Sequence, residues 1–96
     1  MSDAPPRRIG LPWYNREDYP RIRAMMTDQH NLAPTYEAWL ASAENNESVG
    51  QQAGLRIERI LIEPDAFATW CEEKGLEPDG KARTTYAAEM SARISV

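Results

Sequence analysis

Residues 56–62 are the one stretch of this chain that reads clearly as a β-strand, and they constrain the fold more than any other feature. The residues in order are Arg56, Ile57, Glu58, Arg59, Ile60, Leu61 and Ile62. Three isoleucines among seven residues favour extended backbone, although Ile57, Ile60 and Leu61 also match helical spacing, which leaves a helix as the alternative. A lone strand leaves a row of unpaired N–H and C=O groups. Its partner is either the N-terminal segment or a second copy of the chain.

The N-terminal arm is the candidate partner within the chain. Residues 1–8 are rich in proline and charge, which predicts a disordered tail ahead of a single domain over 9–96. Residues 8–11 suit a short edge strand that Pro12 would end. Because aromatic rings are costly to leave in water, Trp13 and Tyr14 indicate that this arm lies across the body. We therefore predict an interface made of Trp13, Tyr14 and residues 56–62.

Helical patterns occupy most of the remaining chain. The predicted helices begin near residue 15 or 18, near 34, at 64 and near 81, and they end near 26, 53, 74 and 94. Pro20 and Pro64 suit first helical turns, while Gly54 and Gly75 suit left-handed helix ends. Asn45 marks a place where the second helix could break. Together these elements predict an α+β fold that is mostly helical, with about four helices and one central strand paired across a dimer.

The charge distribution argues against nucleic acid and anionic membranes as main partners. The net charge is −4, and residues 24–96 hold twelve acidic side chains against six basic ones. A protein that binds nucleic acid or an anionic membrane needs positive side chains to neutralise the phosphate groups, and residues 24–96 are acidic overall. The single cysteine, Cys71, excludes an internal disulfide, and no apolar run approaches the length of a membrane span. With no signal-peptide pattern at the start, we expect a cytoplasmic protein.

Catalytic and metal-binding patterns are missing from the sequence. It contains no C-x-x-C, H-E-x-x-H or G-x-S-x-G motif and no phosphate-binding glycine loop. We interpret Cys71 as a small core residue, because Glu72 and Glu73 beside it would raise its pKa and make the thiol less reactive. Asp28 and the single histidine, His30, suit either a polar turn or an acid–base or metal site. We predict no cofactor, no metal and no catalytic residue.

The order of several short motifs resembles a group of small uncharacterised bacterial proteins. The residues that carry the resemblance are 12–13, 18–20, 36–40, 65–67, 70–71, 75, 82–83 and 86–87. They cover most of the chain after the tail. The resemblance implies no activity.

Residues 56–94 also resemble, in element order, the strand–helix–helix unit of ribbon-helix-helix DNA-binding dimers. That resemblance implies strands that pair between two copies and outward side chains, such as Arg56, that enter the major groove. Glu58 would share that face, the body is acidic, and more than fifty residues precede the strand. These features depart from the family.

Three functional hypotheses remain at this level. The leading one is a non-enzymatic cytoplasmic protein that acts through protein–protein contact, as a homodimer. The second is a DNA-binding regulator of ribbon-helix-helix type. The third is a small enzyme or ligand-binding protein whose site forms between subunits, with Asp28, His30, Glu58 and Arg83 as the polar residues near the groove.

Overall fold

The computed structural model describes residues 7–94. The elements in order are β1 (Arg8–Trp13), α1 (Tyr19–Met25), the 3-10 turn η1 (Gln29–Asn31), α2 (Tyr36–Gln52), β2 (Arg56–Leu61), α3 (Pro64–Lys74) and α4 (Gly80–Ile94). The predicted α+β fold, mostly helical with four helices and an added N-terminal strand, is confirmed. Of the tail predicted for residues 1–8, positions 1–6 lie outside the described residues. Arg8 already belongs to β1, so the folded part begins earlier than predicted.

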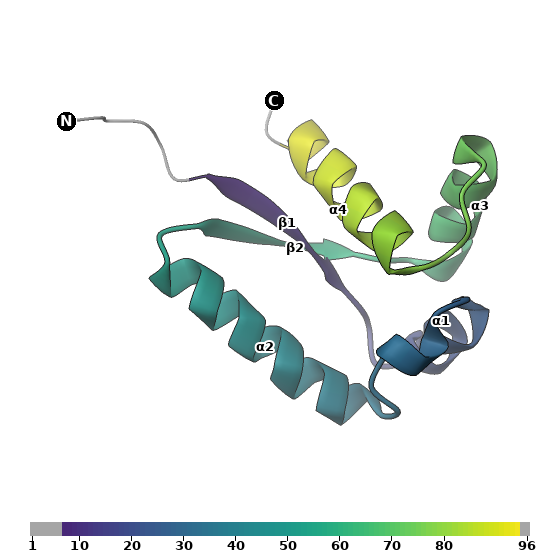
Figure 1. Cartoon of the computed structure of the whole chain (residues 1–96), viewed down its shortest axis with the longest axis horizontal. Coiled ribbons are helices and arrows are strands. Elements are labelled where there is room, and N and C mark those ends of the chain that lie inside the picture. The colour runs from purple at the N-terminus through teal and green to yellow at the C-terminus, as the bar shows by residue number, and fades with distance from the viewer. Residues whose placement is uncertain (1–6, 95–96) are drawn as a thin grey trace.

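The two strands pair with each other in parallel within one chain (Figure 1). Arg8 is in register with Arg56, and Trp13 is in register with Leu61. The strand predicted at 56–62 is thus confirmed, and within the chain its partner is β1. Parallel strands need a long crossover, and here α1, η1 and α2 provide it.

β1 continues through Pro12 instead of ending there. The C=O of Trp13 accepts a hydrogen bond from the N–H of Ile62 at 2.8 Å, so the main chain of Trp13 faces β2. Main-chain groups alternate in direction along a strand, and position 12 therefore faces away from β2. The N–H that Pro12 lacks would point away from β2, so its absence costs no hydrogen bond between the strands.

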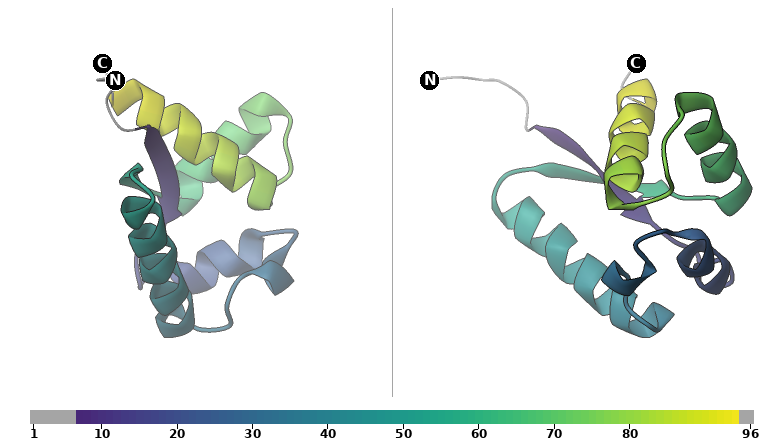
Figure 2. Two further views of the ribbon diagram at one scale, coloured as in Figure 1. Left: turned by 60° about the vertical axis from the view of Figure 1, so that its left-hand side comes forward. Right: turned by 45° about the vertical axis from the view of Figure 1, so that its right-hand side comes forward.

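The ribbon of two strands lies between helices on its two faces. α4 packs mainly on β1, and α2 packs on the opposite face against β2 (Figures 1 and 2). Gly10 permits the close approach of α4, because a Cβ there would lie 2.9 Å from the Cβ of Ser91 and closer still to the carbonyl of Ala87. On the other face Gly50 of α2 lies against the side chain of Ile57.

The helix ends follow local signals in the sequence. Glu63 caps α3 by accepting hydrogen bonds from the N–H groups of Asp65 at 3.2 Å and Ala66 at 2.7 Å. Gly75 ends α3 with a φ of 68°. α2 runs unbroken past Asn45. Within residues 7–94, no helix combines the length and apolarity needed to cross a bilayer.

The core contains two groups of aromatic rings. The first group is Trp13, Tyr14, Tyr19, Tyr36 and Trp39. The second is Phe67, Trp70 and Tyr86, beside the buried thiol of Cys71. The placement of Cys71 in the core is confirmed.

Candidate functional site

The outer edge of β2, on the side away from β1, is the first candidate site. Because the N–H of Ile62 points at β1, the main-chain groups of Ile57, Arg59 and Leu61 point the opposite way. We call these outward N–H and C=O groups the β2 edge. The sheet has two strands, so no strand within residues 7–94 covers this edge. An unpaired row of this kind is a template for another strand.

The side chains along the β2 edge differ in whether a partner chain could contact them. Leu61 is 47% exposed, which makes it one of the three large apolar side chains most open to solvent in the described chain. The guanidinium of Arg59 lies 3.9 Å from the ring centre of Trp13 and donates two hydrogen bonds to the carboxylate of Glu47, at 2.7 and 2.8 Å. Arg59 therefore covers Trp13 and is held within its own chain. Leu61 is the apolar residue left uncovered.

Four residues of the predicted interface lie in the core of the chain: Trp13, Tyr14, Ile60 and Ile62. Trp13 is 8% exposed and Tyr14 is 2% exposed, because both pack against Trp39 of α2. Ile60 and Ile62 are buried as well. The prediction that Trp13 and Tyr14 offer surface to a partner is therefore corrected: the arm does cross the body, but its aromatic side chains face inward.

A second candidate site surrounds an ion pair that the crossover and α4 share. Arg83 donates hydrogen bonds to both carboxylate oxygens of Asp28, from Nη1 to Oδ1 at 2.8 Å and from Nη2 to Oδ2 at 3.2 Å. The Oδ2 atom also accepts from the N–H of Gly80 at 3.0 Å. Hydrogen bonds from Arg83 hold the pKa of Asp28 below its usual value. Asp28 and Arg83 were both predicted to lie near a groove, and the structure brings them together.

A cavity of about 330 Å³ opens beside this pair, between α2, β1 and α4. We call it the Arg83 cavity. Its lining comprises Leu11, Pro12, Tyr14, Asn31, Trp39, Ser42, Ala43, Asn46, Gly80, Arg83 and Thr84. Burial, partly offset by the charge of Arg83, raises the pKa of Tyr14 to about 12, so the phenol stays protonated at neutral pH.

The other polar residues predicted for a groove do not join this site. His30 is exposed on η1 and takes no part in the Asp28–Arg83 pair. Glu58 lies on the α4 face of the ribbon, where its Oε1 is 2.6 Å from the Nε of Arg8. Over the described chain, no three histidine, cysteine or carboxylate side chains gather as metal ligands would.

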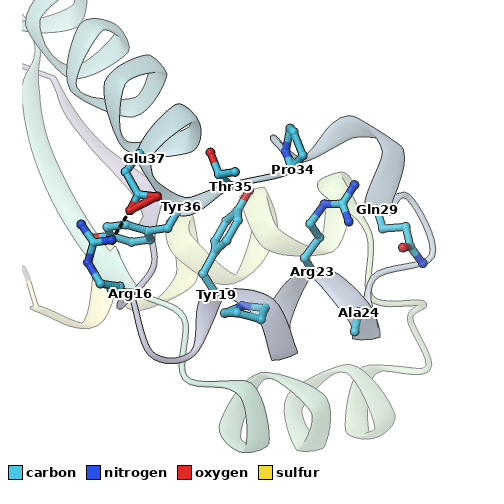
Figure 3. A pocket seen from close by; sticks show the side chains of 10 residues that line it. Arg16, Tyr19, Arg23, Ala24, Gln29, Pro34, Thr35, Tyr36 and Glu37 are labelled. Atoms are coloured by element: carbon cyan, nitrogen blue, oxygen red, sulfur yellow. Dashed lines mark hydrogen bonds and ion pairs between the residues drawn. The ribbon is translucent and has the colours of Figure 1, made fainter.

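A third hollow, of about 400 Å³, lies where α1 faces the start of α2 (Figure 3). The ring of Tyr36 lies under the guanidinium of Arg16, 4.7 Å from its centre, and Arg16 also pairs with Glu37. Tyr19 stands in the middle of the hollow, and its hydroxyl donates to the C=O of Ala33 at 2.5 Å. Arg16, Glu37 and the hydroxyls of Tyr19 and Thr35 are thus bonded within the chain, whereas the Nε of Arg23 makes only a long contact to a carbonyl.

Comparison with known proteins places the chain in a family. A family model described as a domain of unknown function (DUF8829) matches residues 6–96. The chain belongs to this family. Neither the curated proteins nor the solved structures that were compared with it yielded a match. The resemblance to an uncharacterised family is confirmed, and membership of DUF8829 brings a shared fold without an activity.

Sequence reasoning missed two features of these sites in this DUF8829 member. One is the cover that Arg59 gives to Trp13, which depends on the register of two distant strands. The other is the position of Tyr14 in the wall of the Arg83 cavity. Neither Arg59 nor Tyr14 stands in a sequence motif, and no local pattern predicts these contacts. The ribbon-helix-helix resemblance also fails in topology, because β2 pairs in parallel with a strand of its own chain.

Proposed function

We propose that this protein is a non-enzymatic interaction module that works as a homodimer joined along the β2 edge. The observation that supports it is the bare outer side of β2 with Leu61 exposed at its end. Exposed edges are uncommon without a charge, proline or covering segment. β1 has Pro12 on its outer side, whereas the outward positions of β2 contain no proline. Their one charged residue, Arg59, is paired with Glu47 of its own chain.

The expected arrangement is antiparallel pairing of β2 with β2 of a second copy about a two-fold axis. Such an axis gives a self-complementary contact and extends the ribbon to a sheet of about four strands. Centring the axis on Arg59 would set two guanidinium groups opposite each other. Centring it on Ile60 sets Arg59 opposite Leu61 of the second copy and avoids that repulsion. We therefore propose the register centred on Ile60.

The proposal includes a cytoplasmic location and no catalytic activity. The chain has one cysteine, which suits a reducing compartment, and its sequence contains no catalytic motif. A further protein partner could use the same edge, and in that case the wild-type protein would be a monomer when alone. The oligomeric state of the purified protein therefore tests the proposal directly.

The test is sedimentation equilibrium or light scattering over a wide concentration range. We expect a wild-type dimer that dissociates on dilution. Leu61→Lys should shift the protein to monomer, because a charge on an edge strand blocks pairing. Leu76→Lys is the matched control: Leu76 is 41% exposed but lies just after α3, away from β2, so this variant should remain a dimer.

Two results would contradict the dimer. One is a wild-type protein that is monomeric at every concentration. The other is equal behaviour of Leu61→Lys and Leu76→Lys, which would mean that the effect of the lysine is not specific to the β2 edge. Both variants change exposed side chains, so circular dichroism should give the wild-type spectrum for each.

A further inference from the structure

Tyr14 has a hydroxyl group for which the described chain supplies no hydrogen-bond partner. Its side chain is 2% exposed, and no residue from 7 to 94 accepts a hydrogen bond from it. Tyr19 in the same aromatic group differs, because its hydroxyl donates to the C=O of Ala33 at 2.5 Å. A buried hydroxyl without a partner is uncommon in folded proteins and is destabilising.

The free hydroxyl of Tyr14 opens into the Arg83 cavity. Among residues 7–94, Nε1 of Trp70 is the side-chain polar atom that is both fully shielded from solvent and without a hydrogen-bond partner. The hydroxyl of Tyr14 also lacks a partner, so it is not fully shielded and still reaches open space. Tyr14 lines the Arg83 cavity, and its phenol feels the charges of both Arg83 and Asp28. Tyr14 and Arg83 thus line the same cavity, close enough for their charges to interact.

Arg83 adds further donors to the same place. The residue is 8% exposed, and only two of its N–H groups are used in the bonds to Asp28. A guanidinium has five N–H groups and no acceptor. The cavity thus presents a phenolic O–H and unused guanidinium N–H groups, while the charge of Arg83 is already balanced by Asp28.

The rest of the lining includes the polar side chains of Asn31, Ser42, Asn46 and Thr84, but one wall is apolar. The indole of Trp39 and the side chains of Leu11 and Pro12 line it, with Ser42 at the rim. Trp39 is 9% exposed and packs against Tyr14 at 4.8 Å between ring centres, so this wall is firmly held. Small-molecule sites commonly combine an apolar wall with a few converging polar groups.

We propose that the Arg83 cavity binds a small flat molecule through a carbonyl or carboxylate oxygen, which accepts hydrogen bonds from Tyr14 and Arg83. The apolar body of the ligand lies on Trp39. The guanidinium of Arg83 has donors only, so a ligand whose only polar group is a cationic donor cannot bond to it. This site is independent of the β2 edge and would exist in a monomer as well as in a dimer.

The test is titration of the full chain with three probes, followed by NMR of the backbone amides and the Arg83 side chain. Benzamide and benzoate each supply an acceptor oxygen on a flat ring, and the stronger of the two shows whether the acceptor is neutral or anionic. Benzylamine supplies a cationic donor instead. We expect benzamide or benzoate to shift the signals of the cavity residues and benzylamine to leave them unchanged.

Two variants separate binding from folding. Tyr14→Phe removes only the free hydroxyl, so it should keep or raise the midpoint of thermal unfolding while weakening probe binding about tenfold. Tyr19→Phe is the matched control, since it loses the bond to Ala33 and should unfold at lower temperature yet bind the probe normally. Ser42→Phe places a ring at the exposed rim and should abolish binding without touching the core.

Three results would overturn the proposal. The first is that neither benzamide nor benzoate binds. The second is that the bound probe is held equally well by Tyr14→Phe, and the third is that benzylamine binds at the same residues with the same affinity. A lower unfolding midpoint for Tyr14→Phe would also count against it, because that would mean that the hydroxyl has a structural partner.

Discussion

At the scale of single residues, Gly10 determines how closely α4 can lie on β1. A Cβ at this position would meet the backbone of Ala87 and the Cβ of Ser91, and neither belongs to a flexible side chain. In the sequence, Gly10 reads only as a helix breaker close to Pro12. Its actual role depends on a helix some eighty residues later in the chain, which only the fold brings to it.

Gly10→Ala should therefore destabilise the protein by about 2–4 kcal/mol, since α4 must move outward. Gly50→Ala is the control. There the added Cβ would lie 2.8 Å from the mobile end of Ile57, and alanine favours the helix by about 1 kcal/mol over glycine, so we expect little net change. Urea unfolding followed by circular dichroism measures both, and equal midpoints would refute the close-approach argument.

At the scale of elements, capping side chains mark the starts of α2 and α3, and a left-handed glycine marks the end of α3. Thr35 accepts a hydrogen bond from the N–H of Ala38 at 3.2 Å at the start of α2. α2 nevertheless contains Asn45 and Gly50, both poor helix formers, and remains continuous over 17 residues. Packing of its inner face on the ribbon outweighs these local preferences.

Thr35→Ala should lower the free energy of unfolding by about 1 kcal/mol, because the cap bond is lost. Thr85→Ala supplies the comparison. Thr85 lies inside α4, where its hydroxyl donates to the C=O of Lys81 at 2.9 Å, and alanine there should be neutral or slightly stabilising. Chemical denaturation of the two variants checks this, and an equal loss from both would contradict a capping role for Thr35.

At the scale of the whole molecule, the pair of Asp28 and Arg83 ties the crossover to the C-terminal helices. The same segment is joined a second time, because the N–H of Thr27 donates to the C=O of Pro78 at 2.9 Å. These contacts hold α4 on the ribbon at the mouth of the Arg83 cavity. Acid should loosen them, since Asp28 is held as a carboxylate by Arg83.

The sign of the pH effect follows from the direction of the pKa shift. The pKa of Asp28 is lower in the folded protein than in the unfolded chain, so its stabilisation is present above about pH 4 and is lost as pH falls through the folded value. Asp28→Asn should cost about 1–3 kcal/mol at pH 7 and much less at pH 3. Urea unfolding of both proteins at the two pH values measures the gap.

The shifted carboxylates elsewhere do not confuse this comparison. The pKa values of Glu37 and Glu47 are also lowered, by hydrogen bonds from Arg16 and Arg59 respectively, but both groups are present in wild type and variant. The difference between the two proteins therefore reports on Asp28 alone. An equal gap at pH 7 and pH 3 would mean that Asp28 does not contribute as a charged group.

The candidate sites were predictable only in part. Asp28 and Arg83 could be named as polar residues near a groove, but their pairing required the fold to bring them together. Tyr14 was predicted as an interface residue, and instead it lines a cavity. At the end of β2, Leu61 is 47% exposed although its neighbours Ile60 and Ile62 are buried.

The amino-acid sequence by itself determined where the helices and β2 lie. Proline, glycine, capping side chains and β-branched residues act on the backbone within a few positions of themselves, and such effects can be read locally. Tertiary structure alone decided that β1 pairs in parallel with β2, that α4 closes on Gly10 and that Tyr14 and Arg83 line one cavity. The physical reason is that these contacts join residues far apart in the chain, whose interaction free energy exists only once the layers have packed.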